Sequence, residues 1–228
     1  MTILEIEVGH CYCQRNPLWG RGIAKINRQV HSSVLDFERF DASLILTTNG
    51  LELQEHQIQP ATVFTHTGYE PVTEELFHKL LAMTKMVKAA AYAQVVVYQD
   101  LPQSNAPVQT IEEYMAKKND NNFSIIGTKE EPTLKHYQAE RFDLAKGLKR
   151  EECQLTAEQI MQEGYKPIQK STFHAIKDLW TKTQQEVDSL LRSYGIIDDT
   201  PMQTYAEAYA KGMKNLLDGV YDVVDVHK

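Results

Sequence analysis

The chain has 228 residues, of which 42% are hydrophobic and 24% are charged, which is the composition of a folded globular protein rather than a disordered one. Its formal net charge of −7 argues against a dedicated nucleic-acid-binding domain, because such domains are usually basic. No apolar run approaches the ~20 residues of a membrane helix, and the first residues carry acids, unlike a signal peptide. We therefore expect a cytoplasmic protein with no membrane partner.

The first hundred residues predict an α+β domain. Residues 3–8 alternate as a half-buried strand does, and apolar residues from 23 to 37 recur at the spacing of a helix. Asn49-Gly50 between two alternating segments predicts a hairpin. A strand over 61–66, a helix after Thr73 and a strand over 94–99 follow. This order resembles the ferredoxin-like, split βαβ arrangement, in which two helices pack on one face of an antiparallel sheet.

Residues 101–132 predict a connector, with a short helix near 110–118, and residues 133–228 predict an all-helical domain. Apolar side chains from Leu134 to Leu148 mark its first helix, and further helices are expected over 187–194 and 205–217. The tail 220–228 alternates and predicts an edge strand. We expect two domains, 1–100 and 133–228, and no internal repeat.

Within the second domain, residues 155–180 predict two helices joined by a turn. Thr156 can cap the first helix, and Gly164 suits the left-handed conformation that closes it. Apolar residues then mark one side of the second helix. The segment resembles the helix-turn-helix of DNA-binding proteins. By that resemblance the polar side of the second helix would enter the major groove of duplex DNA, through Gln169, Lys170, Ser171, Thr172, His174 and Lys177.

A basic stretch near the N-terminus could add contacts to DNA phosphates. No acid occurs between Val8 and Leu35, whereas four cations do, namely Arg15, Arg21, Lys25 and Arg28. Charge is therefore segregated along the chain, and its distribution matters more for binding than its sum. The first interpretation is a DNA-binding protein of a regulatory or mobile-element type. Scattered surface cations are also ordinary, so a plain solvent-exposed surface is the competing interpretation.

Two other functions remain open from the sequence. One is a non-catalytic interaction or assembly protein that docks a protein partner, or a second copy, through its helical half. The other is a cysteine-dependent enzyme with Cys11 or Cys13 as thiolate and His31, His56 or His66 as base. Zinc would need a second pair of ligands beyond the Cys-x-Cys, and none follows at a usual distance. The sequence therefore predicts no metal and no cofactor, and it favours a protein that is not an enzyme.

Overall fold

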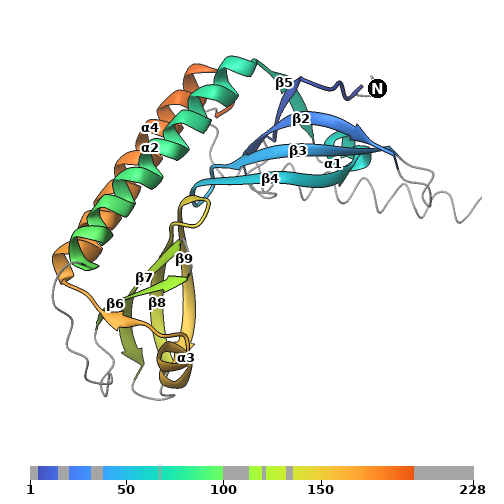
Figure 1. Cartoon of the computed structure of the whole chain (residues 1–228). Coiled ribbons are helices and arrows are strands. Elements are labelled where there is room, and N and C mark those ends of the chain that lie inside the picture. Colours follow the sequence, from blue (N-terminus) through green and yellow to red (C-terminus); the bar gives the residue numbers. More distant parts are fainter. Residues whose placement is uncertain are drawn as a thin grey trace, which may run out of the picture.

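The computed structural model describes residues 5–14, 21–31, 38–66, 68–99, 113–119, 122–131 and 136–197. Within these residues the dominant feature is one ten-stranded antiparallel sheet in the order β10-β6-β7-β8-β9-β4-β3-β2-β1-β5. Figure 1 shows two long helices, α2 and α4, side by side along this sheet. A ferredoxin-like half followed by an all-helical half is therefore the wrong fold class, because the described residues of each half form five strands and two helices.

The described residues form ten strands and four helices. The strands are β1 (Cys11–Gln14), β2 (Gly22–Val30), β3 (Arg39–Leu46), β4 (Gly50–Pro60), β5 (Tyr69–Val72), β6 (Tyr114–Asn119), β7 (Asn122–Glu131), β8 (His136–Asp143), β9 (Gly147–Thr156) and β10 (Lys166–Pro167). The helices are α1 (Ala61–His66), α2 (Glu74–Gln99), α3 (Ala157–Gln162) and α4 (Lys170–Ser193).

The second half of the chain repeats the first. Four strands, a short helix, a short strand and a long helix form the first half (residues 11–99), and the same order forms the second half (114–193). The sequence carries a trace of this repeat: Gly68–Val72 (GYEPV) precedes Phe77-His78, and Gly164–Ile168 (GYKPI) precedes Phe173-His174 at the same spacing. The expectation that the chain has no internal repeat is therefore wrong.

The two halves meet where β4 pairs with β9. Leu51 lies opposite Leu148, and on either side Gly50 lies opposite Lys149 and Glu52 opposite Gly147. Both glycines have positive φ, +115° and +152°, and a Cβ atom on either would lie less than 3.0 Å from a backbone oxygen of the facing strand. Glycine is thus required at both places, because only it allows this approach and this backbone conformation.

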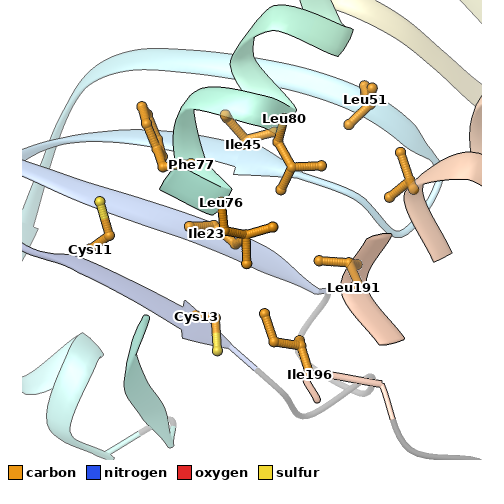
Figure 2. Packing of buried hydrophobic residues seen from close by; sticks show 11 residues of the cluster. Cys11, Cys13, Ile23, Ile45, Leu51, Leu76, Phe77, Leu80, Leu191 and Ile196 are labelled. Atoms are coloured by element: carbon orange, nitrogen blue, oxygen red, sulfur yellow. The ribbon is translucent and has the colours of Figure 1, made fainter. Parts of the chain in front are cut away.

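The long helices run antiparallel and each completes the other half's core. The start of α2 and the end of α4 share one cluster over the first half, including Cys13, Ile23, Leu80 and Leu191 (Figure 2). The end of α2 and the start of α4 share a second cluster over the other half, whose members include Ala91, Phe142, Phe173 and Ile176. Neither half therefore has a complete core without the other.

Hydrogen bonds also join each long helix to the other half of the chain. On α4, Trp180 Nε1 donates to the carbonyl of Asn49 (3.2 Å), and Gln184 Nε2 donates to the carbonyl of Thr47 (3.1 Å). On α2, Lys88 Nζ donates to the carbonyl of Ala145. Each long helix thus binds the β-hairpin turn of the opposite half, which satisfies backbone carbonyls that a turn leaves without ladder partners.

The short helices cover the other face of the sheet. Phe64 of α1 packs with Tyr12, Ile26 and Phe40, and Ile160 of α3 packs with Ile126 and its neighbours. We call this the opposite face, and the one under α2 and α4 the helix face. Because α3 and α4 lie on different faces with β10 between them, they do not form a helix-turn-helix, in which the two helices pack on each other. That resemblance is wrong.

Several predicted elements of the first half are also wrong. Residues 22–30 form a strand rather than the start of a helix, because Ile23 faces the helix face while Ala24 and Ile26 face the opposite one. Residues 61–66 are helix α1 instead of a strand, and 94–99 continue α2 instead of forming a strand. Residues 5–8 are not in a strand. The hairpin at Asn49-Gly50 and the helix after Thr73 are confirmed.

In the second half, the described part of the helix predicted from 134 to 148 is strand β8, the turn after it and the start of β9, and the helix predicted near 110–118 overlaps strand β6. The local features of the 155–180 segment are confirmed: Thr156 caps α3 in a capping box, and Gly164 has φ +75°. The predicted helix over 187–194 is the last part of α4. The helix expected over 205–217 and the tail strand over 220–228 lie outside the described residues.

Candidate functional site

A polar cluster surrounds Asp41 on the helix face of the first half. The Asp41 side chain is only 3% exposed, yet it accepts hydrogen bonds from side chains of both neighbouring strands, β2 and β4. Asn27 Nδ2 lies 3.2 Å from Oδ1, while Arg28 Nε and His56 Nδ1 lie 3.1 and 3.2 Å from Oδ2. Asn27 also donates to the hydroxyl of Ser43 (3.0 Å). We call these five residues the Asp41 cluster.

Two irregularities in the sheet bring the cluster together. Between β2 and β3 the register shifts after Ile26, so Asn27 is an extra residue with no partner in the pairing. Between β3 and β4 it shifts around Ser43, which faces both Glu55 and His56. His56 has φ +54°, and among the described residues no other residue except glycine has positive φ. Such bulges re-aim side chains, and a left-handed backbone costs about 1–2 kcal/mol in a non-glycine residue.

The hydrogen bonds keep Asp41 ionised despite its burial. Burial alone would raise its pKa, but the bonds from His56, Asn27 and Arg28 outweigh that effect and hold the pKa below the usual value of an aspartate. A carboxylate beside the imidazole fixes the Nδ1 proton between them, so Nε2 of His56 points away from Asp41. The cluster therefore has a fixed charge at its base and orients the ring above it.

The second half does not share this arrangement. Strands β7, β8 and β9 pair without a register shift over the whole of β8. When the halves are aligned on Gly50 and Gly147, Gln138 stands at the position of Asp41, and it is exposed. The bulges and the strained His56 are thus not required by the repeated fold, which points to a role in function.

The chemistry available at the surface is that of an anion site. The side chains of Arg28 and His56 are 71% and 78% exposed, so neither long helix covers this end of the sheet. Arg28 bonds to Asp41 through Nε, which leaves its terminal nitrogens for a second acceptor. His56 adds a second donor when its ring is protonated. Two donors held by one carboxylate suit a single phosphate or carboxylate group.

Of the basic residues predicted to contact phosphates, Arg28 is the one that belongs to this cluster. Lys25, on the same strand, forms an ion pair with Glu74 of α2, and Arg21 pairs with Asp188 of α4. Arg15 lies outside the described residues. The predicted stretch of free cations is thus not gathered on one surface, because its described members are divided among three acidic partners.

The residues predicted to enter a DNA groove lie at the start of α4. Gln169 precedes the helix and accepts from the Ser171 hydroxyl, Thr172 is half-buried, and the Lys170 ammonium and the His174 ring lie near the ring of Tyr114. Lys177 Nζ donates to Glu140 of β8 (2.6 Å). These residues run along the sheet beside an acid and an aromatic ring, and they do not form a separate positive ridge.

The cysteines have the setting of core residues. Cys11 and Cys13 are 2% and 0% exposed and pack under α2 (Figure 2). Burial raises the pKa of Cys11 to about 11, although nearby Lys25 acts in the opposite direction. A thiol in this state is protonated at neutral pH, whereas a nucleophilic cysteine needs a depressed pKa and access. Cys153 is half-buried, and none of the three cysteines is in a disulfide. The described residues contain no group of three metal-ligating side chains.

Two members of the site were not predicted as a pair. His56 was expected only as one of three bases for a thiol, and Asp41 was not predicted at all. The available signal was an acid inside the strand segment Phe40–Ala42, where both neighbours are apolar. A buried ionised group requires partners, so such an acid predicts cations or amides on adjacent strands.

No helix in the described part of the chain has the length and hydropathy needed to span a membrane. No family model matches the sequence, and no curated protein or solved structure is significantly similar to it.

Proposed function

We propose that this protein is a non-catalytic interaction protein that binds an anionic group of a protein partner through Arg28 and His56. The observation that carries the proposal is the buried Asp41 carboxylate, which holds both exposed side chains at adjacent bulges. Such an arrangement presents the Arg28 guanidinium, and with it the protonated form of His56, in a fixed geometry, which lowers the entropy that binding would otherwise cost.

An open surface favours binding over catalysis. Arg28 and His56 project from the outer end of a sheet, and their exposure shows that no described part of the chain excludes water from a reacting group there. The hydroxyl within the cluster, on Ser43, forms hydrogen bonds with Asn27, and none is formed between it and His56. Among the described residues, no nucleophile therefore contacts His56 as a catalytic triad requires.

The charge distribution favours a protein partner over a nucleic acid. Binding of DNA depends on several cations that neutralise phosphates together. Here the net charge is −7, and Arg21, Lys25 and Lys177 are each paired with an acid. Two converging donors match one acidic or phosphorylated side chain, so DNA binding remains the weaker proposal.

Titration of the isotope-labelled protein with sodium phosphate and with sodium acetate tests the site by nuclear magnetic resonance. We expect the amide signals of Asn27, Arg28 and His56 to shift in a saturable way. Arg28→Gln should weaken the binding about two- to fivefold, the range for exposed ion pairs. Arg192→Gln, at an exposed arginine on the last turn of α4, is the matched control and should leave it unchanged.

Two results would contradict the proposal. One is an absence of shifts in the cluster at millimolar anion, and the other is an equal response of the Arg28→Gln protein. A duplex DNA titration over a salt series separates the two partner classes. Tight binding that weakens steeply with salt would replace the protein partner with nucleic acid, whereas weak and salt-insensitive binding supports the proposal.

A further inference from the structure

A cavity of about 460 Å³ lies at the same outer end of the first half but on the opposite face of the sheet. Its apolar wall is formed by Ile6, Val8 and Phe40, and α1 closes one side with Ala61 and Thr65. Phe40 precedes Asp41 on β3, and successive strand residues point to opposite faces. The cavity is thus separate from the Asp41 cluster, and a ligand could bind in it whether or not the cluster binds an anion.

Two carboxylates stand beside this apolar wall. Glu5 and Glu38 line the cavity with Gln29, whose side-chain amide donates to Glu38 (3.4 Å). Among the described residues neither Glu5 nor Glu38 has a cationic partner. Acids on the central strands differ in this respect, since Glu52 pairs with Lys149 and Glu151 with Arg141. The cavity therefore combines an apolar surface with negative charge that the described chain does not neutralise.

We infer that this cavity binds a lysine or arginine side chain of a protein partner. The aliphatic part of such a side chain would lie against Ile6, Val8 and Phe40, while its cationic end would meet Glu5 and Glu38. This is the usual behaviour of long cationic side chains, which bury their methylene groups on apolar surface and keep the charge at a polar rim. Glu5, Val8 and Glu38 are exposed, so the chain that carries the side chain can remain outside.

The volume agrees with this ligand class. It lies in the lower part of the range for binding pockets, about 300–1,000 Å³, which exceeds one side chain and leaves space for part of the backbone that carries it. An anion is disfavoured by the two glutamates, and a neutral apolar ligand would leave both of them without a cationic partner. A side chain with methylene groups and a cationic end can contact the apolar wall and pair with the carboxylates at the same time.

The test uses three probes followed by nuclear magnetic resonance on the full chain. They are a blocked tripeptide with a central arginine, the same peptide with citrulline, which has the shape of arginine without its charge, and the free amine agmatine. We expect the arginine peptide to shift the amides of Gln29, Phe40, Ala61 and Thr65 at millimolar concentration. The citrulline peptide should bind at least about threefold more weakly, since it lacks the ion pairs.

Single substitutions then test whether Glu5 and Glu38 are the carboxylates that bind the cationic end of the peptide. Glu38→Gln and Glu5→Gln should each weaken the arginine peptide about two- to fivefold, while Glu186→Gln, at an exposed glutamate of α4, should have no effect. Equal binding of the two peptides would overturn the inference, as would the absence of shifts around the cavity. Much tighter binding of agmatine than of the peptide would also overturn it, because the ligand would then be a free amine.

Discussion

Replacement of the two central glycines by alanine should damage the fold far more than the same change at a surface glycine. At Gly50 and Gly147 an alanine needs positive φ, which costs about 1–2 kcal/mol, and its Cβ would lie less than 3.0 Å from a backbone oxygen of the facing strand. Relief of such a clash requires backbone movement, which costs typically about 1–3 kcal/mol more. The expected loss is therefore about 2–5 kcal/mol for each substitution.

A loss of this size is large against the whole free energy of unfolding, which is about 5–15 kcal/mol for ordinary proteins. Urea unfolding followed by circular dichroism measures it as a lower midpoint at unchanged slope. Gly164→Ala is the matched control, since Gly164 has φ +75° but a Cβ there would meet no atom within 4 Å. If Gly50→Ala or Gly147→Ala costs no more than Gly164→Ala, the close approach of β4 and β9 is not what requires glycine.

Three further predictions concern burial and charge. Asp41→Asn should destabilise the protein above about pH 5, and the difference from wild type should vanish on acidification. The pKa of Asp41 is lower in the folded state than the unfolded value of about 3.9, so its carboxylate stabilises the fold above that value and this stabilisation is lost as the pH falls through the folded pKa. Acid unfolding of both proteins measures the difference. Cys11, whose pKa is about 11, should react with iodoacetamide at neutral pH only after unfolding, and rapid alkylation of the native protein would contradict its burial. Leu191→Ala should cost about 2–5 kcal/mol and lower the unfolding midpoints of both halves together, because Leu191 of the second half packs on Leu76 of the first; two separate transitions would refute a shared core.

Local signals in the sequence predicted local structure correctly. The Asn49-Gly50 hairpin, the start of α2 after Thr73 and the capping box at Thr156 depend on a few adjacent residues, and all are present. Each involves a backbone preference that acts over a single turn, as positive φ or an N-cap does. Such elements can be predicted without knowing what packs on them.

The spacing of apolar residues predicted a helix where the structure has a strand whose buried side chains alternate between the two faces of the sheet. Residues 22–30 are buried on the helix face at Ile23 and on the opposite face at Ile26, so their apolar spacing imitates a helix. The opposite error was made at the end of α2, where a strand was predicted and the structure has a helix. Residues 94–99 are rich in β-branched residues, yet they remain helical, because Ala91 and Val95 are buried on the second half. Tertiary packing overrides propensity in both cases.

The Asp41 cluster depends on contacts between three strands, and no local pattern specifies it. Asn27, Asp41 and His56 meet only because extra residues shift the register of two strand pairs. A one-residue shift reverses which face every later side chain occupies, so the sequence alone does not align these groups. Arg28 was predicted to contact phosphate because of its charge. The structure shows that its side chain also donates a hydrogen bond to the buried Asp41 carboxylate.

Because the chain contains the same unit twice, one half acts as an internal reference for the other. A feature that the fold requires should occur in both halves, and the glycines of the β4–β9 contact do so. The bulges, the positive φ of His56 and the buried Asp41 occur in the first half, and the regular pairing of β8 shows that the unit forms its sheet without them. A costly arrangement that folding does not need is best explained by a bound partner, and for that reason we assign the anion site to the outer end of the first half.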